Sequence, residues 1–82
     1  MENRDVWAGL TDVFRSVFGD DEIVLTAATA AKDIEGWDSI THVQLVVVIE
    51  ERFGVHFNTG ETAGLKNVGQ MVALITARTR QT

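Results

Sequence analysis

The side chains whose types and spacing favour chemistry gather in one short stretch, Gly36-Trp37-Asp38-Ser39-Ile40. Asp38 is a good helix N-cap, because its carboxylate can accept hydrogen bonds from the N–H groups of a first helical turn. Ser39 then falls at the first helical position, where an attached phosphate would face the positive end of the helix dipole and free N–H groups. The pair suits covalent attachment of an anionic group to the Ser39 hydroxyl. In isolation the pattern favours a plain helix cap, and it leaves both interpretations open.

His42 lies three residues after Ser39, which is a spacing that invites comparison with a nucleophile and its base. The sequence has no G-x-S-x-G elbow, and no oxyanion hole or third orienting residue can be named. We therefore expect no catalytic residue. We expect His42 to shield the start of the helix near the attached group, and His56 to lie on the surface.

Composition excludes several other kinds of site. The 82 residues carry twelve acidic and seven basic side chains, a formal charge of −5, which disfavours nucleic acid as a partner. Without cysteine, and with two histidines that do not lie at ligand spacing, no metal site is expected. The acidic run at 20–22 resembles the start of a calcium loop, but no acidic alternation or closing glutamate follows.

The longest apolar run, Leu45 to Ile49, is far shorter than the roughly 20 residues of a membrane helix. No basic segment followed by an apolar run is visible near the first residue. We expect one monomeric, cytoplasmic domain over residues 1–82, without membrane insertion.

Three amphipathic segments and one short segment must position the reactive stretch. Between residues 3 and 18, apolar side chains recur at the three- and four-residue spacing of a helix that buries one face. Residues 67–80 show the same period after a cap at Asn67, and a capping pattern at Asn58 predicts a short helix. The expected fold is all-α, a four-helix bundle with main helices at about 3–18, 38–53 and 67–80, a short helix at about 58–64, and a long loop over 19–37.

The loop over residues 19–37 is unusually long for so small a chain. Loops of this length are usually functional or packed by their own apolar residues. We expect it to be anchored in the core by four apolar side chains: Ile23, Leu25, Ile34 and Trp37.

The segment from Val43 to Ile49 admits two local structures. Its run of β-branched residues is typical of a buried strand. Asp38 as a cap and Gly54 as a stop favour a helix over 38–53 instead, and a lone strand among helices would have no partner. We therefore predict a helix.

A helical wheel gives this helix two apolar faces. Leu45, Val46, Ile49 and Phe53 fall on one side, which we expect to pack in the core. Ile40, Val43 and Val47 fall nearly opposite. A surface helix in so small a domain needs one buried face, so the second indicates contact with a partner, unless another helix of the domain covers it.

The stretch 36–40 and the residues that follow it resemble the signature of acyl carrier proteins. The matching residues after the stretch are Val43, Leu45, Val46, Ile49, Glu50, Glu51, Phe53, Gly54 and Val55. The order of elements is similar over nearly the whole chain. The resemblance implies a free-standing carrier domain with a four-helix bundle, in which the short helix is counted.

The same resemblance implies that Ser39 receives 4′-phosphopantetheine from coenzyme A through a phosphopantetheinyl transferase. Asp38 matches the aspartate that assists the divalent metal of that enzyme. The thiol of the arm would then carry acyl intermediates to acyl-loading, condensing or acyl-transfer enzymes. The residues that match the family's docking surface are Ile40, Val43, Val47, Glu50 and Glu51.

Two departures from the family's pattern concern this docking surface. Many fatty-acid carriers have an acid at the positions of Thr41 and Gln44, and leucine is commonest at the position of Ile40. We interpret both as signs of a specialised carrier that serves its own enzymes in fatty acid, polyketide or specialised lipid synthesis.

Two alternatives to an acyl carrier stay open at this point. One is an aminoacyl or peptidyl carrier, although such carriers usually have Gly-Gly-(His/Asp)-Ser before the helix. The other is an unmodified helical adaptor that binds a partner through Ile40, Val43 and Val47.

Overall fold

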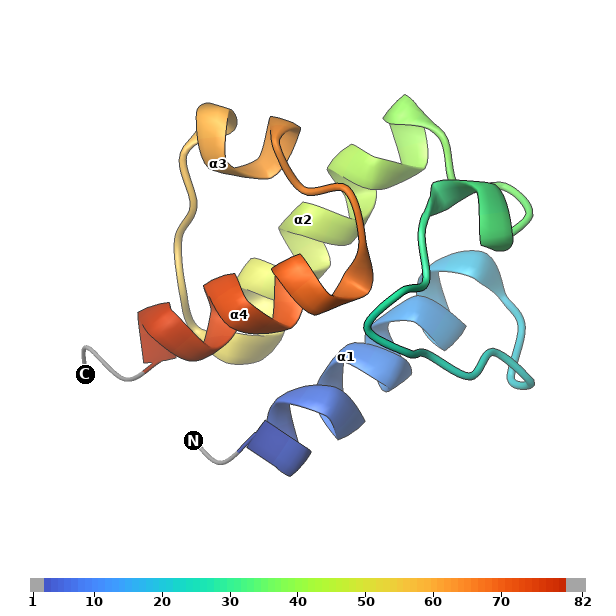
Figure 1. Ribbon diagram of the computed structural model, residues 1–82, viewed down its shortest axis with the longest axis horizontal. Coiled ribbons are helices and arrows are strands. Elements are labelled where there is room, and N and C mark those ends of the chain that lie inside the picture. Colours follow the sequence, from blue (N-terminus) through green and yellow to red (C-terminus); the bar gives the residue numbers. More distant parts are fainter. Residues whose placement is uncertain (1–2, 80–82) are drawn as a thin grey trace.

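The computed structural model describes residues 3–79, and within that range its regular elements are all helices (Figure 1). In chain order they are α1 (Asn3–Phe18), the short 3₁₀ helix η1 (Ala31–Asp33), α2 (Ser39–Phe53), α3 (Thr59–Ala63) and α4 (Val68–Thr79). The all-α prediction is confirmed, with four α-helices near their expected bounds. None of the described helices is long and apolar enough to cross a membrane.

Small differences from the expected bounds have local causes. Asp38, Asn58 and Asn67 lie just outside their helices because each accepts hydrogen bonds from the first turn as a cap. Asn3 is the first residue of α1, as in the expected range of 3–18. Arg80, the expected last residue of the final helix, lies outside the described residues.

The β-branched run from Val43 to Ile49 is helical throughout. Its helix packs against α1, and α1 also packs against α4, so the three long helices share one interior. Tertiary packing therefore overrides the local preference of valine and isoleucine for strands.

The core lies between α1, α2 and α4. Its buried apolar side chains are Val6, Leu10, Val13, Phe14, Trp37, Leu45, Ile49, Phe57, Val68, Met71, Val72 and Ile75. Gly9 is buried where α1 and α2 approach each other, since a Cβ atom at this position would lie 2.8 Å from the Phe53 ring. The absence of a side chain at Gly9 therefore permits this close contact. The apolar periodicity of residues 3–18 does not reveal it.

The long loop is held against the rest of the chain by apolar side chains and by backbone hydrogen bonds. Ile23, Leu25 and Ile34 pack against the core, and Trp37 is buried, so all four predicted anchors are confirmed. Backbone carbonyls of the loop also accept the first N–H groups of α4, from Val68 and Gly69. These bonds satisfy helix-end donors that would otherwise lack a partner. The 3₁₀ turn η1, which was not predicted, lies in this loop beside the start of α2 (Figure 1).

The short helix α3 is held by individual polar bonds. Asn58 and Glu61 form the predicted reciprocal capping box, with distances of 2.8 and 3.0 Å. Arg78 of α4 pairs with Glu61 and donates to the backbone oxygen of His56 at 2.8 Å. Arg78 therefore ties α4 to α3 and to the loop before it.

Candidate functional site

The candidate site is the N-terminal end of α2. The chain enters it through Gly36, whose φ of +90° lies in the region that favours glycine. Trp37 follows and is buried, with its ring edge-on to Phe14 at a centroid distance of 5.2 Å. The loop before Ser39 is therefore fixed by one sharp turn and one aromatic anchor.

Asp38 and Thr41 lock this loop to the helix through a reciprocal capping box. The Asp38 Oδ1 atom accepts from the N–H groups of Ile40 at 2.9 Å and Thr41 at 3.0 Å. The Thr41 hydroxyl accepts from the Asp38 N–H at 2.8 Å and donates to the Gly36 carbonyl at 2.7 Å. From the sequence, Thr41 was interpreted only as a missing acid. Its position three residues after the cap was the signal for this role.

The same hydrogen bonds set the charge state of Asp38. Donation from the Thr41 N–H, and then from the Ile40 N–H, holds the pKa of the Asp38 carboxyl below its ordinary value of 3.8. Each of these bonds uses Oδ1. The carboxylate is therefore ionised at neutral pH, and its other oxygen takes no part in these bonds.

Ser39 is exposed and is the first residue of α2. A phosphate on its hydroxyl would face the positive end of the helix dipole. The N–H groups of Ile40 and Thr41, which the sequence left available for such an anion, are taken by Asp38. These two N–H groups are therefore not free for an anion, whereas the helix dipole still favours one at this position.

A cleft of about 440 Å³ opens beside Ser39, which is within the usual size range of ligand sites. The start of α2, the η1 turn and the segment after α3 line it. The lining residues are Ala31, Trp37, Asp38, Ser39, His42, Ala63, Leu65 and Lys66. The set includes one lysine, Lys66. The cleft beside Ser39 therefore combines apolar side chains with one positively charged residue.

His42 does not face Ser39 as a base. Its Nδ1 atom accepts from the Trp37 indole N–H at 3.2 Å, and its Nε2 atom lies 3.0 Å from the Thr62 carbonyl oxygen. Because Nδ1 is an acceptor, Nε2 carries the proton and donates it to that carbonyl. Both nitrogens are thus committed to structure, and His42 does shield the start of α2 as expected. His56 is on the surface, where it pairs with Glu50 at 3.1 Å.

The predicted docking residues divide into two groups. Ile40, Val43 and Val47 are exposed, at 71%, 63% and 48%, so helices of the described chain leave the second apolar face uncovered. Glu51 is exposed as well. Glu50 is only partly exposed, and its carboxylate accepts from the Phe57 N–H at 2.8 Å. Its charge therefore also serves the turn after α2.

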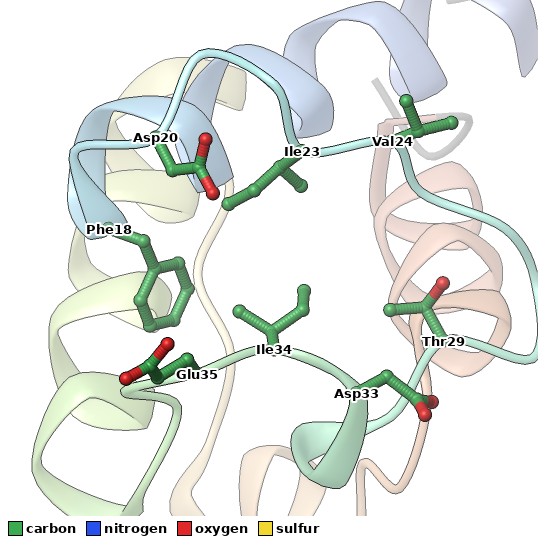
Figure 2. A pocket seen from close by; sticks show the side chains of 8 residues that line it. All are labelled: Phe18, Asp20, Ile23, Val24, Thr29, Asp33, Ile34 and Glu35. Atoms are coloured by element: carbon green, nitrogen blue, oxygen red, sulfur yellow. The ribbon is translucent and has the colours of Figure 1, made fainter.

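A second depression of about 630 Å³ lies over the long loop. Figure 2 shows Ile23 and Ile34 projecting into it, with Asp20 and Glu35 near its rim. Neither Asp38 nor Ser39 lines it. Among residues 3–79, no group of three or more His, Cys, Asp or Glu side chains is arranged to hold a metal ion. The larger depression therefore lacks the chemical groups that the smaller cleft brings together.

Comparisons with known proteins identify a family that matches most of the chain. Residues 8–75 match the family model described as phosphopantetheine attachment site. The meromycolate extension acyl carrier proteins of Mycolicibacterium aurum and Mycolicibacterium smegmatis are each 31% identical over 72 residues, which is 88% of this chain and 74% and 73% of theirs. The solution NMR structure of a holo acyl carrier protein from Geobacter metallireducens has a TM-score of 0.87 and 42% identity. This match covers 93% of this chain and 87% of that chain.

Proposed function

The chain belongs to the acyl carrier protein family, and on that premise we propose that Ser39 is the residue that bears its 4′-phosphopantetheine arm. The observation that carries the proposal is the exposed Ser39 hydroxyl at the first position of α2, directly after a cap that fixes the loop. The protein acts as an acyl carrier, and the thiol of the arm holds the acyl group as a thioester.

The residues around Ser39 fit an anionic tether. The Ser39 oxygen would form the new bond to phosphorus while the pyrophosphate bond of coenzyme A breaks and adenosine 3′,5′-bisphosphate leaves. The hydroxyl proton would pass to a base of the transferase. The helix dipole would stabilise the negative charge of the resulting phosphodiester, and Lys66, which lines the same cleft as Ser39, would add a positive charge to that cleft.

Asp38 suits a role in that modification step. Its carboxylate is ionised and exposed, and its hydrogen bonds to the first turn use one oxygen. Divalent metals such as Mg²⁺ prefer carboxylate oxygens as ligands. We propose that the other oxygen of Asp38 helps to position the transferase's metal next to Ser39.

We propose that partner enzymes dock on the exposed face of α2 formed by Ile40, Val43 and Val47, with Glu51 beside it. The family implies a transferase and enzymes of acyl synthesis as partners. An apolar face close to the attachment residue is a surface on which such enzymes can bury area while they reach the arm. Glu50 is a weaker member of this surface, because its carboxylate is bound within the chain.

We infer the cargo from the class of protein to which the relatives belong. They are acyl carriers, and two are named for meromycolate extension. We propose an acyl rather than an aminoacyl cargo, used in fatty acid, polyketide or specialised lipid synthesis. We further propose that residues 1–82 act as one non-catalytic, monomeric carrier domain. The predicted cytoplasmic location stays a prediction.

The two serines of the chain allow a matched test. Wild type, Ser39→Ala and Ser16→Ala would each be incubated with coenzyme A, Mg²⁺ and a broad-specificity phosphopantetheinyl transferase, and then weighed by intact mass spectrometry. We expect one phosphopantetheine on wild type and on Ser16→Ala, because Ser16 is an exposed residue of α1. Ser39→Ala should gain none, with an unchanged circular dichroism spectrum. A modified Ser39→Ala protein would overturn the assignment.

A further inference from the structure

Three residues beside the Ser39 cleft are joined by hydrogen bonds in series. Trp37 donates to His42, and His42 donates to the backbone oxygen of Thr62 in α3. The Trp37 and His42 rings are also stacked, at 6.1 Å between centroids and 12° between planes. We name this series the Trp37–His42–Thr62 clasp. Its second bond joins the first turns of α2 to a helix 20 residues further along the chain.

The clasp stands between two surface depressions. One is the Ser39 cleft. The other is a groove of about 260 Å³ between α2 and the segment around α3, whose wall includes Val43, Val46 and Phe57. His42 lines both. The two depressions therefore share His42, and a chain that passed from the Ser39 cleft into the groove would pass its side chain.

Behind the clasp the interior is filled. Trp37 is only 8% exposed and packs against Phe14, with Phe18 at a centroid distance of 6.5 Å. Leu45 and Ile49, on the inner side of α2, are also buried. Protein interiors of this kind hold no spare volume for an alkyl chain unless a side chain moves. Arg78 also holds α3 and the loop before it, and among these contacts the clasp is the one that joins α3 to the start of α2.

We propose that the Trp37–His42–Thr62 clasp determines cargo specificity by keeping the acyl chain outside the bundle. The attachment end of the arm then lies in the Ser39 cleft, against the apolar wall of Trp37 and Leu65 and near the Lys66 charge. Short or polar acyl groups are tolerated there. A long alkyl chain loses the burial that would stabilise it. This inference rests on attachment at Ser39.

The test uses an octanoyl arm loaded by the transferase onto isotopically labelled protein. Spectra of the holo and octanoyl forms are compared by NMR, through the Trp37 indole N–H and the Ile49 and Ile75 methyl groups. In wild type we expect the indole signal to shift on loading and the two methyl signals to stay. In His42→Ala, which opens the wall, both methyl signals should shift as the chain enters the core.

Matched variants keep the outcome interpretable. His56→Ala removes the other histidine from an exposed position and should behave as wild type. Trp37→Phe removes the indole donor but keeps a ring in the core, so it weakens the clasp even if His42→Ala fails to fold. We expect Trp37→Phe to show the same methyl shifts as His42→Ala.

The measurements distinguish a failure of attachment at Ser39 from a failure of the clasp to exclude the chain. If mass spectrometry finds no arm on wild type, attachment at Ser39 is wrong, and this inference falls with it. If wild type is loaded and the Ile49 and Ile75 methyl signals shift as much as in His42→Ala, the clasp does not exclude the chain. The role of the clasp is also wrong if Trp37→Phe, folded and loaded, leaves both methyl signals unchanged.

Discussion

The two faces of α2 differ in burial, although both carry valine and isoleucine. The inner face buries Leu45 and Ile49 against α1 and the core. The outer face leaves Ile40, Val43 and Val47 exposed to solvent. Both faces carry branched apolar residues, so the surroundings decide which of them stabilise the fold and which stay exposed. With docking on the outer face as proposed, stability and recognition can be changed separately on one helix.

The largest effect should come from the inner face. Leu45→Ala removes a fully buried side chain and leaves a cavity, so we expect the free energy of unfolding to fall by about 2–5 kcal/mol. Val47→Ala, two residues away on the outer face, should change it by less than about 0.5 kcal/mol. Chemical denaturation monitored by circular dichroism measures both. Equal losses in the two variants would contradict the separation of the faces.

This separation was visible in the sequence to a large extent. The wheel placed Leu45 and Ile49 inward and Val43 outward, because the helical period assigns faces without knowledge of the neighbours. It could not decide whether another helix covers the outer face, since that depends on where the short α3 packs. The capping residues Asp38 and Asn58 were also predictable, because a cap acts over three or four residues.

What the sequence did not reveal are contacts between distant or atypical partners. Gly9 lies in the helix interior, where glycine usually weakens a helix, and only the approach of Phe53 explains it. The bond from His42 to Thr62 spans 20 residues and depends on the packing of α3. The role of Thr41 was local and could have been found from the capping-box spacing. The family's pattern at this position concerns its charge and does not indicate this hydrogen bond.

An intermediate effect is expected on the outer face. Val43→Asp places a charge in the exposed apolar surface, and we expect kcat/KM for modification by a phosphopantetheinyl transferase to fall about tenfold with the fold unchanged. Ser16→Asp is the matched control, since it adds the same charge at an exposed position of α1. A much smaller loss in Ser16→Asp would assign the effect to the surface around Val43. Equal losses would assign it to charge and contradict docking through Val43.

The smallest effect on stability is expected at Asp38, the cap residue directly before α2. Its cap fixes the first residue of α2, and since each residue turns the helix by about 100°, the cap also fixes which side chains point outward. The pKa of Asp38 is lowered in the folded protein, so its contribution to stability is present above its ordinary value of 3.8 and is lost as pH falls through the folded pKa. Asp38→Asn keeps the shape of the side chain and removes this ionisation.

We therefore expect wild type to unfold at a higher temperature than Asp38→Asn near neutral pH, and the gap to shrink as the pH falls below 3.8. Other acids, Glu61 among them, titrate in both proteins and largely cancel in the difference. The loss of stability at low pH should also be confined to the start of α2. Amide exchange at Ile40 and Thr41, whose N–H groups bind the carboxylate, should accelerate at low pH relative to the change at Leu45 in the buried half. A gap that is independent of pH would mean that the shape of the Asp38 side chain, and not its charge, holds the start of α2.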